Sequence, residues 1–295
     1  PRPDLVSIII PVHNRAAMLR EAVRSVLEQT YRPIEIVIVD DGSTDDTPEV
    51  AQALAGQKPG VVRVLRQPNA GPGPARQAGL EASRGELIQF LDSDDLLLPH
   101  KFAVQVAGLA ADPEAGISYG LTLLRDERTG QTAPTHGTDV RRRELLPAIV
   151  QGRIWATPTP LYRRSVCVAI GPWASLRVLE DWDYDWRAAL LGVKLHYHPE
   201  PLAVVRHHGR DHAGLAWLDR GDAARQRVLA LERMLRYAEQ AGVPAQSAEM
   251  QQFARNLFLV ARQYGAGGLA EESRQLFALA RRASGEVRGA GLDFR

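Results

Sequence analysis

Two carboxylates, Asp92 and Asp94, stand two residues apart directly after the expected strand from Glu86 to Leu91. In a turn that follows a buried strand, such a pair presents two oxygen ligands side by side. Mg²⁺ and Mn²⁺ typically take one or two carboxylates together with phosphate oxygens of a substrate. The pair therefore suggests a site shared by a divalent metal and a diphosphate. An alternative stays open, because Asp92 or Ser93 could simply cap the helix expected next.

A second acidic pair, Asp40 and Asp41, follows the apolar run from Ile34 to Val39. An acidic residue at the tip of a second parallel strand is where nucleotide-binding folds recognise a ribose or a base. The same residues could instead turn the chain into a helix. Gly71 and Gly73 do not form the dinucleotide fingerprint, which would follow the first strand as G-x-G-x-x-G, so a dehydrogenase is not expected.

The elements that must position these residues alternate regularly between strand and helix. Continuous apolar runs predict buried strands over Leu5 to Ile10, Ile34 to Val39, Val61 to Leu65 and Glu86 to Leu91. Helical spacing predicts helices over Arg15 to Gln29, Asp45 to Leu54 and Pro74 to Ala82. Buried strands joined by helices predict an α/β fold with a mostly parallel central sheet flanked by helices. Ligands bind beyond the carboxyl ends of such strands, so both acidic pairs and Arg76 should meet at one rim.

The rest of the chain predicts further strands and a helical end. Extra strands are expected over Gly116 to Leu124 and Lys194 to Arg206, with a helix from Leu179 to Leu191. The segment from Ala156 to Tyr162 contains two prolines and is expected to form an irregular edge. From about Ala213, helical spacing predicts two to four helices packed on the domain. We therefore expect a catalytic domain over residues 1–210 and a helical extension over 211–295.

Several of these motifs together resemble glycosyltransferase family 2, the inverting enzymes with a GT-A fold. The segments that carry the likeness are Ser7 to Asn14, Ile38 to Asp45, Gly73 to Gly79 and Phe90 to Asp95. Later segments are similar to the family's acceptor side and its Glu-Asp motif: Tyr162 to Ser165, Ile170-Gly171 and Glu180 to Asp183. The likeness covers roughly residues 5 to 210. Each motif is short, but the joint order and spacing are specific.

The resemblance implies a Rossmann-like GT-A domain and a role for each matching residue. The nucleotide would lie against Pro11, His13, Asp41, Arg76, Asp92 and Ser93. Within this set, Asp41 would accept a hydrogen bond from the base, as family members do with uracil. Asp94 would be the main protein ligand of a Mn²⁺ or Mg²⁺ ion that stabilises the departing nucleoside diphosphate. His208, two residues after Arg206, would reach the metal or the diphosphate, although with His207 it could instead close a flexible loop.

The resemblance assigns the general base to Asp181. Inversion in one displacement needs a carboxylate opposite the leaving group to take the acceptor's proton, and placement matters more than an extreme pKa. Glu180 and Asp183 compete for this role, and Asp181 could also be an ordinary cap at the positive end of a helix.

This sequence departs from the family pattern at three places: His13 stands where an aromatic is common, Gln77 where Asn is common, and Pro172-Trp173 where glycine and an aromatic are common. Trp173, Trp182 and Trp186 could form a stacking platform for a sugar or could equally serve packing.

Composition excludes several other classes of protein. The chain has 295 residues and a formal net charge of +1, so charge gives no sign of a nucleic-acid partner. Its single cysteine, Cys167, excludes an intrachain disulfide and a multi-cysteine zinc site, and lies in a stretch expected to be core. No apolar run approaches the roughly 20 residues of a membrane span, and no export signal is visible. We expect a cytoplasmic protein.

The helical end is mildly basic, and two roles are expected for it. It could lie against the inner face of an anionic membrane, or it could form a homodimer. Arg225, Arg233 and Arg236 could otherwise form an ordinary solvated helix face.

Taken together, the sequence predicts a metal-dependent inverting glycosyltransferase that uses a nucleotide sugar, with a UDP-sugar favoured by the resemblance. The acceptor would be a hydroxyl of a saccharide, a lipid-linked saccharide or a protein. The alternative is a catalytically idle module of the same fold that binds sugar nucleotides or carbohydrate; the presence of Asp92, Asp94 and Asp181 disfavours it. A nucleotidyltransferase would be expected to show a basic, glycine-rich loop early in the chain, and none is found.

Overall fold

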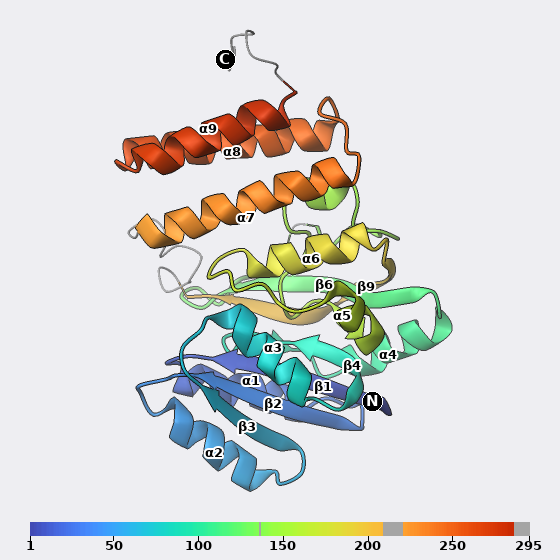
Figure 1. The fold of residues 1–295 in the computed structure, drawn as a ribbon. Coiled ribbons are helices and arrows are strands. Elements are labelled where there is room, and N and C mark those ends of the chain that lie inside the picture. The colour runs from blue at the N-terminus through green and yellow to red at the C-terminus, as the bar shows by residue number, and fades with distance from the viewer. Residues whose placement is uncertain (136, 209–220, 286–295) are drawn as a thin grey trace. The chain divides into compact units, whose positions relative to one another are not determined.

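The computed structural model describes residues 1–135, 137–208 and 221–285 (Figure 1). It divides into two compact units. The first unit comprises Pro1–Glu144, Ile154–Ser175 and Leu191–His208. The second comprises Leu145–Arg153 and Leu176–Leu190 together with the chain from residue 209 onward. The boundary expected at residue 210 lies outside the described residues and stays a prediction.

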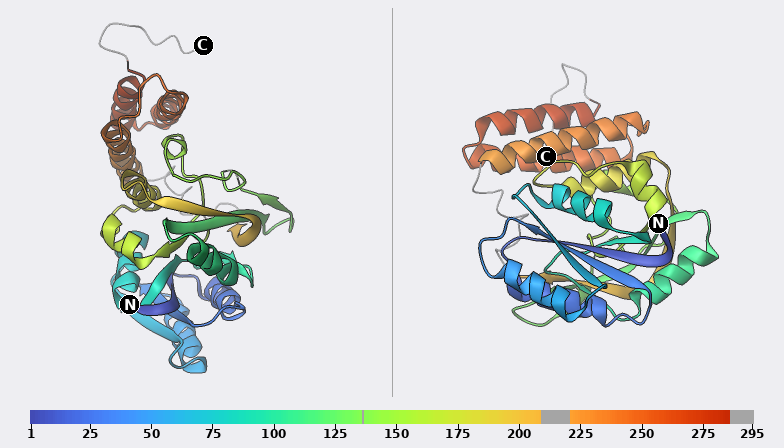
Figure 2. Two further views of the ribbon diagram at one scale, coloured as in Figure 1. Left: turned by 90° about the vertical axis from the view of Figure 1, so that its right-hand side faces the viewer. Right: turned by 60° about the horizontal axis from the view of Figure 1, so that its bottom comes forward.

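The first unit is built on one mixed sheet (Figures 1 and 2). Its strands are β1 (Arg2–Val12), β2 (Ile34–Asp41), β3 (Val62–Gln67), β4 (Gly85–Phe90), β5 (Leu96–Leu97), β6 (Ala115–Asp126), β7 (Thr132–Pro134), β8 (Leu161–Arg163) and β9 (Lys194–His207). They follow the order β3-β2-β1-β4-β8-β6-β9-β5, and β7 pairs with β6. The neighbours β3, β2, β1 and β4 are parallel, as the alternating pattern predicted.

Helices cover both faces of this parallel part. The helices of the first unit are α1 (Ala16–Leu27), α2 (Thr47–Gln57), α3 (Pro72–Ala82), α4 (Lys101–Ala111) and α5 (Arg164–Ile170). Because side chains alternate along a strand, Ile36 and Ile38 of β2 join the core cluster that contains residues of α1, α2 and α4. Val37 and Val39 instead pack with Ala75 of α3. Burial on both faces explains why these strands are continuously apolar.

One expectation about the sheet is wrong. The segment from Ala156 to Tyr162 was expected at an edge, but β8 lies between β4 and β6 and is antiparallel to both. Its prolines, Pro158 and Pro160, fall before the paired residues, so their missing N–H groups do not interrupt the ladder. The two prolines lie only in the residues that precede the strand. Their presence therefore gave no sign of the short central strand that follows.

The second unit is helical. It contains a short 3₁₀ helix, η1 (Ala148–Val150), and the helices α6 (Glu180–Leu190), α7 (Gly221–Gln240), α8 (Ala248–Ala266) and α9 (Ala270–Ala283). The breaks between the last three occur at glycines, since Gly242 and Gly268 adopt positive φ angles of 69° and 82°. Ser247 then caps α8 by accepting a hydrogen bond from the backbone N–H of Met250. None of the described helices combines the length and apolarity needed to cross a membrane.

Candidate active site

The carboxyl ends of three neighbouring strands bring the acidic motifs to one edge of the sheet. Val12 near the end of β1 pairs with Asp40 of β2, and Ile9 pairs with Phe90 at the end of β4. The loops that follow these strands therefore start side by side, as expected for parallel strands. These loops and strand ends carry most of the residues to which the sequence assigned nucleotide and metal binding: His13, Asp41, Asp92, Ser93 and Asp94.

The loops after β1 and β2 are tied together by hydrogen bonds. Asn14 adopts a left-handed φ of 52°, which asparagine tolerates better than most residues. Its N–H donates to Ser43 Oγ at 2.9 Å, and its Oδ1 accepts from the N–H of Thr44 at 2.8 Å. His13 Nδ1 lies 3.0 Å from the carbonyl oxygen of Asp41. His13 is thus held over the second loop, while Pro11 is buried in β1.

Asp41 organises the loop that leads into α3. Its buried carboxylate accepts hydrogen bonds from Gln67 Nε2 at 2.8 Å and from the N–H groups of Ala70 at 2.9 Å and Gly71 at 2.8 Å. An ionised carboxylate has about four acceptor positions, so a further donor such as a base N–H can still be accepted. The sequence assigned Asp41 to the base; the structure adds that it fixes the loop beside which a base would lie.

Arg76 of α3 connects the nucleotide motif to the acidic turn. Its buried guanidinium pairs with Asp92, with Nη2 to Oδ1 at 2.6 Å. The guanidinium carbon lies 4.8 Å from the ring centroid of Trp173, within the range of a cation–π contact. Trp173 in turn packs edge-on against Phe90, with ring centroids 4.9 Å apart.

All three tryptophans are buried. Trp173 is buried in the first unit, whereas Trp182 and Trp186 are buried in α6 of the second. Their burial favours packing over a sugar platform.

The turn after β4 alternates between accessible and buried side chains. The N–H of Asp95 donates to the carbonyl oxygen of Asp92 at 3.0 Å and closes the turn. Ser93 and Asp95 are buried, while Asp92 and Asp94 keep partial solvent access. Burial, reinforced by repulsion from Asp92 and Asp94, raises the pKa of Asp95 well above its ordinary value. The two accessible carboxylates are those that the sequence assigned to ribose and metal.

The capping interpretation of this turn is wrong. The next helix, α4, begins at Lys101 with His100 at its N-cap, and β5 lies between the turn and the helix. Neither Asp92 nor Ser93 can therefore cap it. The turn is instead held by arginines: Arg15 Nη1 forms an ion pair with Asp94 Oδ2.

Arg206 is a site residue that the sequence did not single out, except as a landmark for His208. Its side chain is 3% exposed, its Nε donates to the carbonyl oxygen of Asp94, and its Nη1 pairs with Glu21. Its own N–H donates to Asp95 Oδ1 at 3.1 Å. These contacts tie the end of β9, and with it His207 and His208, to the acidic turn. The available signal was an arginine inside an otherwise apolar stretch of an alternating strand.

The protein alone provides an incomplete set of metal ligands. Within the described residues, no group of three or more His, Cys, Asp or Glu side chains is arranged to hold an ion. Asp94 lies in the acidic turn, and His208 directly follows β9. One carboxylate and one imidazole leave most positions around a divalent ion open, which suits an ion whose remaining ligands come from a diphosphate.

Asp181 belongs to the second unit, in the first turn of α6. Its side chain is 26% exposed, whereas the other acidic residues of this helix, Glu180, Asp183 and Asp185, are buried. Asp181 Oδ2 pairs with Arg153 Nη1, and its Oδ1 accepts from the N–H of Trp182 at 2.7 Å. Among the three competing carboxylates, accessibility therefore favours Asp181 as a group that meets a substrate.

The comparisons with known proteins agree with this geometry. Residues 7–167 match the model of glycosyl transferase family 2. The chain belongs to this family. A curated relative, an uncharacterised glycosyltransferase of Nostoc sp., is 36% identical over 211 residues, which cover 69% of this chain and 65% of that protein. The family member described here thus spans slightly less than two thirds of the relative's length.

Solved structures share the fold at low sequence identity. The S. aureus TarS fragment 1–349 in complex with UDP-GlcNAc has a TM-score of 0.68 at 20% identity, over 95% of this chain and 81% of the fragment. The mannosyltransferase PcManGT from Pyrobaculum calidifontis, in complex with GDP-Man and Mn²⁺, has a TM-score of 0.58 at 20% identity, over 97% of this chain and 77% of its own. The mixed α/β sheet flanked by helices is therefore the GT-A type of fold that the family 2 motifs implied.

Proposed function

We propose that this chain transfers a sugar from a nucleotide-sugar donor to an acceptor hydroxyl with inversion at the anomeric carbon. The observation that carries the proposal is the turn from Asp92 to Asp95, whose accessible carboxylates lie at the carboxyl end of β4 beside Arg15 and Arg76. Acidic and cationic groups at one strand edge suit a metal–diphosphate pair. The carboxylates would hold the metal ion, and the arginines would pair with the phosphates.

The nucleotide is proposed to lie over the loops after β1 and β2. Asp41 would accept a hydrogen bond from the base, and His13 and Pro11 would border it. Arg76, Asp92 and Ser93 would contact the ribose and the phosphates. We favour a UDP-sugar as donor; TarS with UDP-GlcNAc supports it, while PcManGT with GDP-Man makes a GDP-sugar the first alternative to test.

A divalent ion, Mn²⁺ or Mg²⁺, is proposed on Asp94 with His208 as a second protein ligand. When bound, such an ion neutralises the charge that develops on the departing nucleoside diphosphate. Arg206 is proposed to keep Asp94 in place for this task, because its Nε donates to the carbonyl oxygen of Asp94 and its N–H donates to Oδ1 of the next residue, Asp95.

Asp181 is proposed as the general base. The acceptor oxygen attacks the anomeric carbon, the bond to the β-phosphate oxygen breaks, and its electron pair leaves with the nucleoside diphosphate. Asp181 takes the hydroxyl proton as the new glycosidic bond forms. The ion pair with Arg153 holds the carboxylate in one orientation. The acceptor is proposed to be a saccharide, a lipid-linked saccharide or a protein.

The test is nucleoside diphosphate release from a panel of UDP-, GDP- and dTDP-sugars with Mn²⁺ or Mg²⁺. We expect release from one nucleotide class, dependent on metal and lost in Asp94→Asn. Asp46→Asn is the matched control, because Asp46 is an exposed carboxylate whose side chain makes no cap hydrogen bond at the start of α2. Metal-dependent binding without turnover of any donor would indicate either that an acceptor is required or that the chain is the idle module. No binding of any donor by calorimetry would refute the nucleotide-sugar proposal.

A further inference from the structure

Arg233 and Tyr237 of α7 make an unexpected contact with the helix that carries Asp181. The fully buried carboxylate of Asp183 accepts from Arg233 Nε at 2.9 Å and from the Tyr237 hydroxyl at 3.0 Å. Arg233 Nη2 also donates to the Tyr237 oxygen at 3.1 Å. The other oxygen of Asp183 pairs with Arg187, one turn later on α6.

We propose that α7 is a positioning element for the general base, with Arg233 and Tyr237 fixing the rotation of α6 and so the direction of Asp181. This inference rests on the proposed function, in which Asp181 takes the acceptor's proton. It assigns a task in the transfer reaction to the helical end of the chain. Arg233 and Tyr237 act through Asp183 and are positioning residues.

Helix geometry explains how the contact works. Successive residues of an α-helix are about 100° apart, so Asp181 and Asp183 point in directions that differ by roughly 200°. When Asp183 is held against α7, Asp181 is turned to the opposite side of α6. Asp185 lies four residues after Asp181 and shares its face, which is why both carboxylates contact Arg153.

Helix α8 contacts both α6 and the segment that precedes Arg153. Trp182 packs edge-on against Phe253 of α8, with ring centroids 6.0 Å apart, and its Nε1 donates to the carbonyl oxygen of Ile149 at 3.1 Å. Asn256 of α8 donates to the carbonyl oxygen of Gln151 at 3.3 Å, two residues before Arg153. Helix α6, which carries Asp181, thus contacts both α7 and α8, and the segment that leads to Arg153 contacts α8.

The energetics of this buried cluster indicate that it fixes the orientation of α6 more than it adds to the stability of the fold. A buried carboxylate with two arginines carries a large desolvation cost, and an apolar contact of the same volume is often as stable or more so. An ionic cluster instead fixes the orientation of the helix, because several hydrogen bonds converge on one carboxylate and permit only one rotation. The arginine at position 233 therefore does not belong to a solvated helix face, one of the interpretations that the sequence had left open.

The experiment compares variants of the full-length chain in nucleoside diphosphate release from the donor that the panel identifies. Water takes the place of the acceptor hydroxyl and loses its proton to the same base. Arg233→Met removes both contacts of the guanidinium. The matched control is Arg236→Met, because Arg236 lies one turn away on α7, is more than half exposed and pairs with Glu232 of the same helix.

For Arg233→Met we expect kcat to fall by about 10- to 100-fold, since a misplacement of about 1 Å costs on that order. The KM for the donor should stay within about twofold, because donor binding is assigned to the first unit. Arg233→Lys should recover part of kcat, and Arg236→Met should match the parent. Tyr237→Phe, which removes one hydroxyl, should lower kcat in the same direction and serves as the test if Arg233→Met does not fold.

The decisive comparison places Arg233→Met on an Asp181→Asn background. If Arg233 acts through Asp181, the second change should lower the residual rate no further. A parent-like kcat for Arg233→Met, or an equal loss with and without Asp181, would overturn the positioning role while leaving Asp181 as the base. Parent-like release by Asp181→Asn would instead refute the assignment of the base, whatever Arg233→Met does.

Discussion

Arg15 and Asp94 form an ion pair at the acidic turn, from Nη1 of the arginine to Oδ2 of the carboxylate. The backbone of Arg15 is also anchored, because its N–H donates to Thr47 Oγ1 at 3.0 Å. The carboxylate assigned to the metal is therefore already neutralised by a side chain of the protein. A divalent ion on Asp94, as proposed, would have to displace the guanidinium or share the carboxylate with it, so Arg15 would compete with that ion.

Arg15→Met is therefore expected to tighten Mn²⁺ binding in the presence of a nucleoside diphosphate. A partly exposed ion pair is worth about 0–1 kcal/mol, so the gain in affinity should not exceed about fivefold. Calorimetric titration of Mn²⁺ measures it. Arg24→Met on α1 is the control, since Arg24 is largely exposed and faces Glu28 at 4.0 Å. Weaker Mn²⁺ binding in Arg15→Met would show that Arg15 supports the diphosphate instead of competing with the ion.

Arg76→Lys is expected to raise the KM for the donor by about 5- to 30-fold with a smaller effect on kcat. Lysine keeps the charge but loses the flat guanidinium that contacts both Asp92 and the ring of Trp173. Loss of a buried charge-assisted hydrogen bond and a cation–π contact corresponds to about 1–2 kcal/mol. Arg63→Lys is the control, because Arg63 pairs with Glu35 away from the acidic turn. An equal rise in KM for both variants would contradict the role of Arg76.

The sequence was informative where interactions are local or periodic. Continuous apolar runs predicted the strands from β1 to β4, and parallel pairing then placed Asp41, Arg76 and the Asp92–Asp94 turn at one edge. These inferences need only the period of two for strands, that of 3.6 for helices, and the rule for carboxyl ends. The pairs of residues that hold the site together were harder, because they lie far apart in the chain.

Three arginines show the limit of predicting such contacts from the sequence. Arg15 meets Asp94, Arg206 anchors the same turn, and Arg233 meets Asp183, and in each case the partner lies dozens of residues away or more. The sequence contains 36 lysines and arginines, so charge alone did not distinguish these three from solvated surface arginines. Such contacts are decided by the tertiary packing of strands and helices, to which a single sequence gives no direct signal.

Gly42 is expected to be intolerant of a side chain for two separable reasons. Its φ of 76° lies in the left-handed region, and an added Cβ would come within 2.7 Å of the backbone nitrogen of Asn69. Gly60 has a similar φ of 81° but nothing within 4 Å of an added Cβ. Gly60→Ala should therefore lower the free energy of unfolding by about 1 kcal/mol, the cost of the backbone conformation alone.

Gly42→Ala should cost clearly more, and it should also weaken donor binding, because Asn69 belongs to the loop that Asp41 organises. Chemical denaturation gives the first quantity and calorimetry with the donor the second. Equal losses of stability in Gly42→Ala and Gly60→Ala would show that the contact with Asn69 relaxes without cost.

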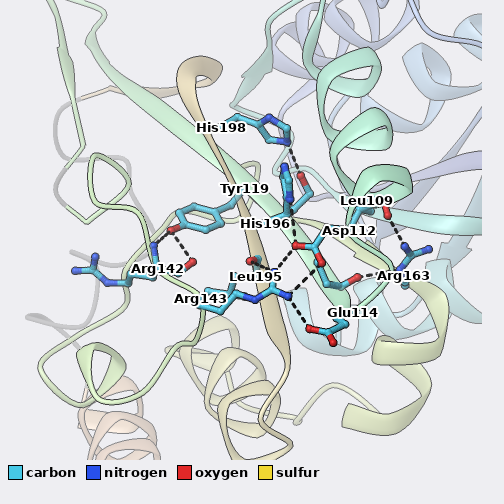
Figure 3. A network of polar contacts seen from close by, with 12 residues as sticks. Leu109, Asp112, Glu114, Tyr119, Arg142, Arg143, Arg163, Leu195, His196 and His198 are labelled. Carbon is cyan, nitrogen blue, oxygen red and sulfur yellow. Dashed lines mark hydrogen bonds and ion pairs between the residues drawn. The ribbon is translucent and has the colours of Figure 1, made fainter.

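His198 should make the stability of the first unit fall under acid conditions. Its Nε2 lies 3.0 Å from Ser118 Oγ, and its ring packs beside that of His196 (Figure 3). Burial, together with the positive charges of His196 and Lys101, lowers its pKa from 6.5 to about 4. Nδ1 of His196 itself lies 3.3 Å from Oδ2 of Asp112. The folded chain therefore keeps His198 neutral at a pH where the unfolded chain protonates it.

Because the folded pKa is the lower one, this contribution to stability is complete above pH 6.5 and is lost as the pH falls toward 4. The parent should lose on the order of 1–3 kcal/mol through this group over that interval. His198→Gln, which can keep the hydrogen bond to Ser118, should show a flatter dependence of the free energy of unfolding on pH. His100→Gln is the control, because the His100 side chain, at the N-cap of α4, is 44% exposed and its Nε2 lies 3.4 Å from Glu200 Oε2. Urea denaturation at a series of pH values measures the slopes, and parallel slopes for the parent and His198→Gln would contradict the assignment.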